Sequence, residues 1–251
     1  MNKLQKFEEM AGFPHVIQAE FNEVFRQDYH LKGNWNKLFF GNDNPIVLEL
    51  GCGKGEYTVE LARRFPEKNF IGIDIKGARM HVGASQSFRE SLKNVAFIRT
   101  HIEMVDSFFT NNEIDEIWLT FPDPQMQKTR KRLTSTRFLA LYSKLLKQNG
   151  EIHLKTDSNF LFTYTTALIK ENQFMVLEEY TDIDKQSSTE SILLSIRTYY
   201  EQRFLSHNIP IKYCRFILDQ SLPFRELDIE IPLDSYHNAG RSVKLYNRAV
   251  K

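Results

Sequence analysis

This sequence of 251 residues lacks the patterns that would place it at once among disulfide-rich or zinc proteins. Its two cysteines, Cys52 and Cys214, lie far apart and form no CxxC motif, and its seven histidines form no HExxH motif. These absences argue against a disulfide framework and the common zinc patterns. We therefore expect no metal site and a reducing, cytoplasmic location.

Charge and hydropathy narrow the possible classes of protein further. The net charge is +1, so a nucleic-acid partner has to be argued from local patches. No run approaches the ~18 apolar residues of a membrane span, and residues 1–9 lack the apolar core of a signal peptide. We expect no membrane partner. A hydrophobic content of 41% is compatible with a sizeable core.

Short apolar runs alternate with helical patterns along most of the chain. The predicted strands span residues 46–50, 70–75, 95–99, 116–121, 151–155 and 174–178. The predicted helices span residues 56–65, 77–91, 136–147, 159–171 and about 190–205. This alternation predicts an α/β fold with a doubly wound, mostly parallel sheet. Two late strands are also predicted, at 211–218 and, with the alternation of a half-exposed edge strand, at 226–231.

The most informative feature is a buried-strand pattern, residues 46–50, that runs into glycines at alternate positions. These are Gly51, Gly53 and Gly55. Glycines at a strand exit let the backbone turn sharply and approach a ligand closely. Asp74 follows near the end of the next predicted strand, where an acid can bind both hydroxyls of a ribose. The pattern indicates a nucleoside-cofactor site, although a plain strand–helix turn needs glycines too.

Small differences indicate which cofactor is bound. The dinucleotide fingerprint is GxGxxG, whereas this chain has GxGxG. Glu49, two residues before the first glycine, would repel a pyrophosphate and attract a cation. S-adenosylmethionine carries a sulfonium and an ammonium and no phosphate. We therefore predict S-adenosylmethionine rather than a dinucleotide.

A second group of residues surrounds Asp123. Pro122 and Pro124 fix the backbone on both sides of this aspartate, at the end of a predicted strand next to the first one. An Asx-type turn is the structural alternative. Residues 125–150 then hold seven basic residues and no acid. Such a run is often a solvated surface, but beside a site it suits a polyanion held through phosphates. The predicted phosphate contacts are Lys128, Lys131 and Arg132.

Six short segments together resemble one family. They are residues 49–55 (ELGCGKG), 72–74 (GID), 121–124 (FPDP), 131–133 (KRL), 154–157 (LKTD) and 198–201 (TYYE). In order and spacing, from about residue 14 to residue 204, the chain resembles the bacterial tRNA (guanine-N7)-methyltransferase family. The resemblance implies a class I, Rossmann-like methyltransferase fold. It also implies methyl transfer from S-adenosylmethionine to N7 of the variable-loop guanine of tRNA.

The resemblance also implies residue roles. Three carboxylates match the family's cofactor contacts, and one of them is its proposed catalytic residue: Glu49, Asp74 and, as catalytic residue, Asp123. Three further residues match its substrate contacts: Asp157, Thr198 and Glu201. For Asp157, a helix cap is the alternative. His101 stands where the family usually has an acid or amide at the adenine edge, and Gln127, followed by Lys128, stands where it prefers lysine.

This chemistry needs no nucleophile or metal from the protein. Guanine N7 has an in-plane lone pair and no proton to lose, so catalysis is mainly orientation, and Asp123 can stabilise the developing cation. Two other classes stay open: a methyltransferase for a small molecule or a protein, and a non-catalytic tRNA-binding protein. The sequence is compatible with a monomer or a homodimer.

The chain is predicted to divide into three stretches. Residues 1–43 form an N-terminal segment that is a candidate for tRNA contact. Residues 44–205 form the methyltransferase domain. Residues 206–251 supply late strands and a tail that complete the same domain.

Overall fold

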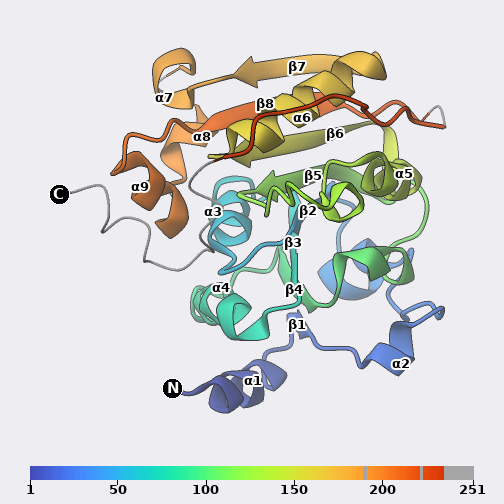
Figure 1. The fold of residues 1–251 in the computed structure, drawn as a ribbon. Helices are drawn as coiled ribbons and strands as arrows, with labels where there is room; N and C mark the ends of the chain where they lie inside the picture. Colours follow the sequence, from blue (N-terminus) through green and yellow to red (C-terminus); the bar gives the residue numbers. More distant parts are fainter. Residues whose placement is uncertain (189–190, 221–222, 235–251) are drawn as a thin grey trace.

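The computed structural model describes residues 1–188, 191–220 and 223–234. Its strands form one eight-stranded sheet in the order β1-β4-β3-β2-β5-β6-β8-β7 (Figure 1). The strand bounds are β1 Val16–Ile17, β2 Ile46–Leu50, β3 Asn69–Asp74, β4 Val95–Arg99, β5 Ile114–Thr120, β6 Leu146–Thr156, β7 Met175–Tyr180 and β8 Lys212–Ile217. The strands from β1 to β6 are parallel, and β8 runs antiparallel to both β6 and β7.

Helices connect the strands. The α-helices are α1 Lys3–Ala11, α2 Phe21–Val24, α3 Glu56–Arg64, α4 Gly77–Arg89, α5 Thr136–Leu145, α6 Asn159–Glu171, α7 Ile183–Gln186, α8 Ile192–Ser195 and α9 Tyr199–Leu205. A π-helix, η1 Trp35–Phe40, and two 3-10 helices, η2 Ile102–Ser107 and η3 Thr129–Lys131, complete the described elements.

The two faces of the sheet carry separate apolar cores. On β2, Leu48 packs into one core and Val47 into the other, because successive strand side chains point to opposite faces. Residues of α5, α6, η1 and η2 cover the first face, and residues of α1, α3, α4 and α8 cover the second. Helices on both faces of a mostly parallel sheet make the fold doubly wound, as predicted.

The predicted strands and helices recur with shifts of up to five residues at their ends, and α1, α2 and α7 were not predicted. Three further differences concern the strands and the late helix. β1 was not predicted, and it pairs with β4 through Val16 and Ile17. Residues 226–231 form no strand: Leu227 and Ile231 pack against the first core, while β7 is the edge strand. The single helix predicted near 190–205 is two short helices, α8 and α9, and its first residue lies outside the described residues.

Candidate active site

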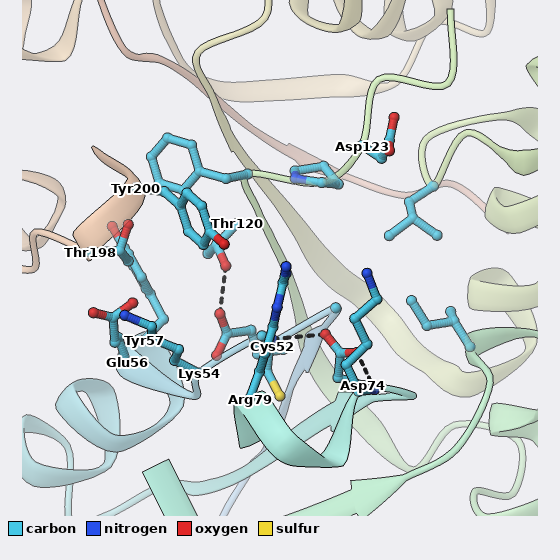
Figure 2. A pocket seen from close by; sticks show the side chains of 18 of the residues that line it. Cys52, Lys54, Glu56, Tyr57, Asp74, Arg79, Thr120, Asp123, Thr198 and Tyr200 are labelled. Atoms are coloured by element: carbon cyan, nitrogen blue, oxygen red, sulfur yellow. Dashed lines mark hydrogen bonds between the residues drawn. The ribbon is translucent and has the colours of Figure 1, made fainter. Parts of the chain in front are cut away.

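A pocket of about 400 Å³ opens at the carboxyl-terminal edge of the sheet. It is lined by the ends of β2, β3, β5 and β6 with the loops that follow them, and by residues of α9. Open α/β folds bind ligands at this edge. Figure 2 shows Asp74 on one side of the pocket, Thr198 and Tyr200 on another, and Asp123 across from Asp74. The predicted cofactor residues around the glycines and the predicted catalytic residue therefore share one cavity.

The glycine loop faces the open space of this pocket. Gly51 and Gly53 have φ values of 79° and 57°, which residues that carry a side chain rarely adopt. A Cβ on Gly51 would meet no atom within 4 Å, and one on Gly53 would lie 3.9 Å from its nearest atom. Gly55 differs, because its Cβ would lie 2.7 Å from the Phe97 ring. The first two glycines leave room for a ligand, and the third allows close packing.

Asp74 is fixed at the end of β3 by two backbone donors. Its Oδ2 accepts a hydrogen bond from the N–H of Gly53 at 2.9 Å, and its Oδ1 accepts one from the N–H of Lys76 at 2.7 Å. A carboxylate oxygen can accept more than one hydrogen bond. The arrangement therefore presents a rigid acceptor pair to the pocket, suited to the two hydroxyls of a ribose.

Glu49 lies at the floor of the pocket and is buried. One carboxylate oxygen accepts hydrogen bonds from the backbone N–H and hydroxyl of Thr58, and the other accepts one from the hydroxyl of Thr120. Burial raises the pKa of Glu49 to about 7, and these hydrogen bonds act in the opposite direction. A cation bound beside this carboxylate would favour its charged form.

Asp123 stands on a turn with unusual backbone on both sides. Phe121 and Gln125 have φ values of 49° and 45°, which are uncommon for residues with a Cβ. The Oδ1 atom of Asp123 accepts a hydrogen bond from the N–H of Gln125 at 3.1 Å. The segment thus contains an Asx-type turn, and the same turn holds Asp123 at the pocket.

Comparisons with known proteins identify the family. A family described as "Putative methyltransferase" matches residues 43–214. A tRNA (guanine-N(7)-)-methyltransferase of Bacteroides fragilis is 56% identical, and the match covers 96% of this chain and 95% of that protein. A protein of the same name from Porphyromonas gingivalis is 56% identical over 93% of this chain and 97% of its own length. The chain belongs to the tRNA (guanine-N7)-methyltransferase family.

Solved structures agree on the fold of this methyltransferase. An antibiotic-related methyltransferase has a TM-score of 0.56 at 16% identity, and the match covers 76% of this chain and 95% of that one. The 16S rRNA methyltransferase KamB has a TM-score of 0.57 at 13% identity, covering 77% and 96%. The predicted class I, Rossmann-like fold is confirmed.

The residues that match the family's substrate contacts occupy different environments in this methyltransferase. Asp157 and Thr198 line the pocket, and Asp157 is buried. Asp157 does not cap α6, because Ser158 is the N-cap and its side chain accepts from the N–H of Leu161. Glu201 is fully buried beneath the pocket wall, is not among the lining residues, and pairs with Lys155 at 2.8 Å.

The three predicted phosphate contacts also differ in their exposure to solvent. Lys131 is exposed and lines the pocket, and Lys128 is exposed on the preceding loop. Arg132 is buried with a relative exposure of 3%. Its guanidinium donates to the carbonyls of Pro124, Gln125 and Met126 at 3.1 to 3.2 Å. Arg132 therefore holds the Asp123 turn from within, and the expectation that it faces a phosphate does not fit this placement.

His101 is exposed and precedes η2, and the pocket is lined by the next residue, Ile102. Several lining residues were not predicted: Lys54, Tyr57, Arg79, Thr120, Tyr200 and Arg203. Arg79 lies five residues after Asp74, in the first turn of α4, and this spacing was the one signal available for it. Figure 2 shows its side chain reaching into the cavity from below.

The residues described by the structure contain no group of three or more metal-ligating side chains that could hold an ion. Within the same residues, every helix is too short or too polar to cross a membrane.

Proposed function

We propose that this enzyme transfers the methyl group of S-adenosylmethionine to N7 of the variable-loop guanine of tRNA. One observation carries the proposal: the pocket joins a glycine loop and a fixed acid, Asp74, to the Asp123 turn and Lys131. The glycine loop and Asp74 suit a nucleoside cofactor, Asp123 suits a base that becomes cationic, and Lys131 suits the phosphates of the substrate. The family membership of the chain gives the reaction that uses both.

The residues of the pocket fit S-adenosylmethionine. Asp74 offers two oriented acceptors for the ribose, and the open space before Gly51 lets a ligand approach the backbone. Glu49 supplies a carboxylate toward the cationic methionine end. When bound, the cofactor supplies an electrophilic methyl group on a sulfonium.

The protein contributes orientation and charge to the reaction. Guanine N7 attacks with a lone pair and loses no proton, so no general base is needed. The Asp123 carboxylate, held by its own turn, stabilises the positive charge that develops on the imidazole ring of the guanine. Asp157 and Thr198 line the same pocket, and they are the proposed hydrogen-bond partners of the guanine edge.

Lys131 and Lys128 are the proposed contacts for phosphates beside the target guanine, because both are exposed and Lys131 lines the pocket. Residues 1–43 are a proposed second contact with tRNA. Since tRNA is the substrate, we place the enzyme in the cytoplasm. His101 stays a proposed contact at the adenine edge. Its neighbour Ile102 lines the pocket, whereas His101 is not among the lining residues.

Incubation with unmodified tRNA and cofactor labelled in the methyl group tests this function. We expect label on one guanine, at N7, which chemical cleavage at N7-methylguanine locates. Labelling of a metabolite or protein pool in place of tRNA would indicate a methyltransferase for a small molecule or a protein. Tight tRNA binding without any labelling would indicate a binding protein.

A further inference from the structure

A buried ion pair lies directly beneath the wall of the pocket. Lys155, near the end of β6, has a relative exposure of 0%. Its Nζ donates to the hydroxyl of Tyr57 at 2.6 Å, to the carbonyl of Leu193 at 2.7 Å and to the carboxylate of Glu201 at 2.9 Å. One ammonium thus joins β6, α3, α8 and α9.

The charges of this cluster balance. Glu201 also accepts from Arg197 at 2.5 Å, and Arg197 in turn pairs with Asp184. Burial lowers the pKa of Lys155 to about 8, although Glu201 acts in the opposite direction. Lys155 and Arg197 thus face Glu201 and Asp184. Removing Glu201 would leave the buried Lys155 ammonium without its carboxylate, and removing Lys155 would leave Glu201 with Arg197 alone.

The cluster holds the segment that forms one wall of the pocket. Thr198 caps α9 by accepting from the N–H of Glu201 at 3.1 Å. The N–H of Tyr199 donates to Glu56 at 3.1 Å, and Lys54 lies 4.2 Å from the centre of the Tyr199 ring. Thr198 and Tyr200 then project into the pocket beside Tyr57 (Figure 2).

A direct contact between Glu201 and the guanine does not fit this geometry. The side chain of Glu201 has a relative exposure of 0%, and its oxygens accept from Lys155 and Arg197. A guanine edge would have to displace one of these cations and reach below the pocket wall. Replacing a buried, charged partner by a neutral donor is costly.

We propose that Lys155 and Glu201 are positioning residues, which hold the α8–α9 wall so that the guanine meets Asp123, and that Glu201 acts through Lys155 rather than on the base. This inference rests on the proposed function. It predicts that substituting either residue slows methyl transfer and leaves the preference of the enzyme for guanine over other bases unchanged.

The test compares wild type, Lys155→Met, Glu201→Gln and the double variant on two tRNAs. One carries the target guanine and the other carries inosine there, which lacks the exocyclic amine but keeps N7. We expect each single variant to lower kcat per folded molecule by about ten-fold or more, with cofactor Kd within about two-fold of wild type. The double variant should be no slower than the worse single variant, because the pair acts as one unit.

The ratio of kcat/KM for guanine to that for inosine decides between the two roles of Glu201. The inference expects the wild-type ratio in every variant. A ratio that falls toward one in Glu201→Gln while Lys155→Met keeps it would show direct contact with the base and overturn the inference. Unchanged kcat in both single variants would also overturn it, since the pair would then serve stability alone.

Two controls separate positioning from loss of folding. Leu168→Ala removes a buried side chain of α6 that is not among the pocket residues, and it should lower the unfolding temperature but keep kcat. If a single variant does not fold, the double variant decides, because it buries no unpaired charge from this pair. A wild-type protein that methylates neither tRNA would refute the proposed function and this inference with it.

Discussion

Replacing Arg132 with lysine tests whether the basic run contains a structural residue. The change keeps the positive charge and removes the guanidinium fork. Arg132 makes three hydrogen bonds to the carbonyls of residues 124–126, and its guanidinium lies 4.1 Å from the centre of the Tyr164 ring. A lysine ammonium carries its donors on one nitrogen, so it cannot occupy the positions of both Nε and Nη2. We therefore expect at least one hydrogen bond of a charged group to be lost, at about 1.5 to 3 kcal/mol. The free energy of unfolding should fall by about 1.5 to 3 kcal/mol.

The same substitution should slow the enzyme, because Asp123 stands on the turn that Arg132 holds. Denaturant unfolding gives the stability, and tRNA methylation at saturating cofactor gives kcat. The neighbouring Lys131→Gln is the matched control: it should keep stability and lower the salt slope of tRNA binding by about one unit. Wild-type stability and kcat in Arg132→Lys would refute the structural role. A salt slope reduced in Arg132→Gln as in Lys131→Gln would restore Arg132 as a phosphate contact.

Three further outcomes can be measured. Asp74→Ala should weaken S-adenosylmethionine binding by about 1 to 3 kcal/mol in calorimetry through lost ribose hydrogen bonds, and wild-type affinity would remove Asp74 from the site. Asp123→Asn should lower turnover strongly with little change in tRNA affinity, whereas turnover within a few-fold of wild type would show that its charge is dispensable. Burial raises the pKa of Glu49 from 4.5 to about 7, so the folded protein holds this proton over a range in which the unfolded chain releases it. This contribution to the free energy of unfolding is complete below about pH 4.5 and is lost as the pH rises through about 7. Between pH 5 and pH 8, the free energy of unfolding should therefore fall less in Glu49→Gln than in wild type, by up to about 3 kcal/mol, as denaturant unfolding at the two pH values can show.

The central sheet could be predicted because its strands are buried on both faces and read as apolar runs. β1 could not, since two residues, Val16 and Ile17, are too few to show a period. Residues 226–231 have the alternation of an edge strand, but β7 occupies the edge of the sheet next to β8. The local sequence does not determine which of two such segments pairs with β8. The place of β8 between β6 and β7 is likewise a property of the assembled sheet.

The candidate site was predicted best where local spacing fixes geometry, as in the glycine loop and the turn at Asp123. It was predicted least well where a charge is buried by distant parts of the chain. Arg132 sits in a run of basic residues that resembles a solvated face, yet Phe160 and Tyr164 of α6 cover it. Glu201 looks like a residue of a helix surface, and only the tertiary structure reveals Lys155 beneath it.

The position of β8 has a consequence for the order in which the enzyme is made. β8 is the last of the described strands to be synthesised, yet it lies inside the sheet, and β7 has no other described partner. β7 must therefore wait until residues 212–217 have left the ribosome. α8 and α9 lie between these two strands in the sequence. A growing chain can therefore complete the parallel strands, with the glycine loop and Asp74, before β7 and β8 extend the sheet beyond β6.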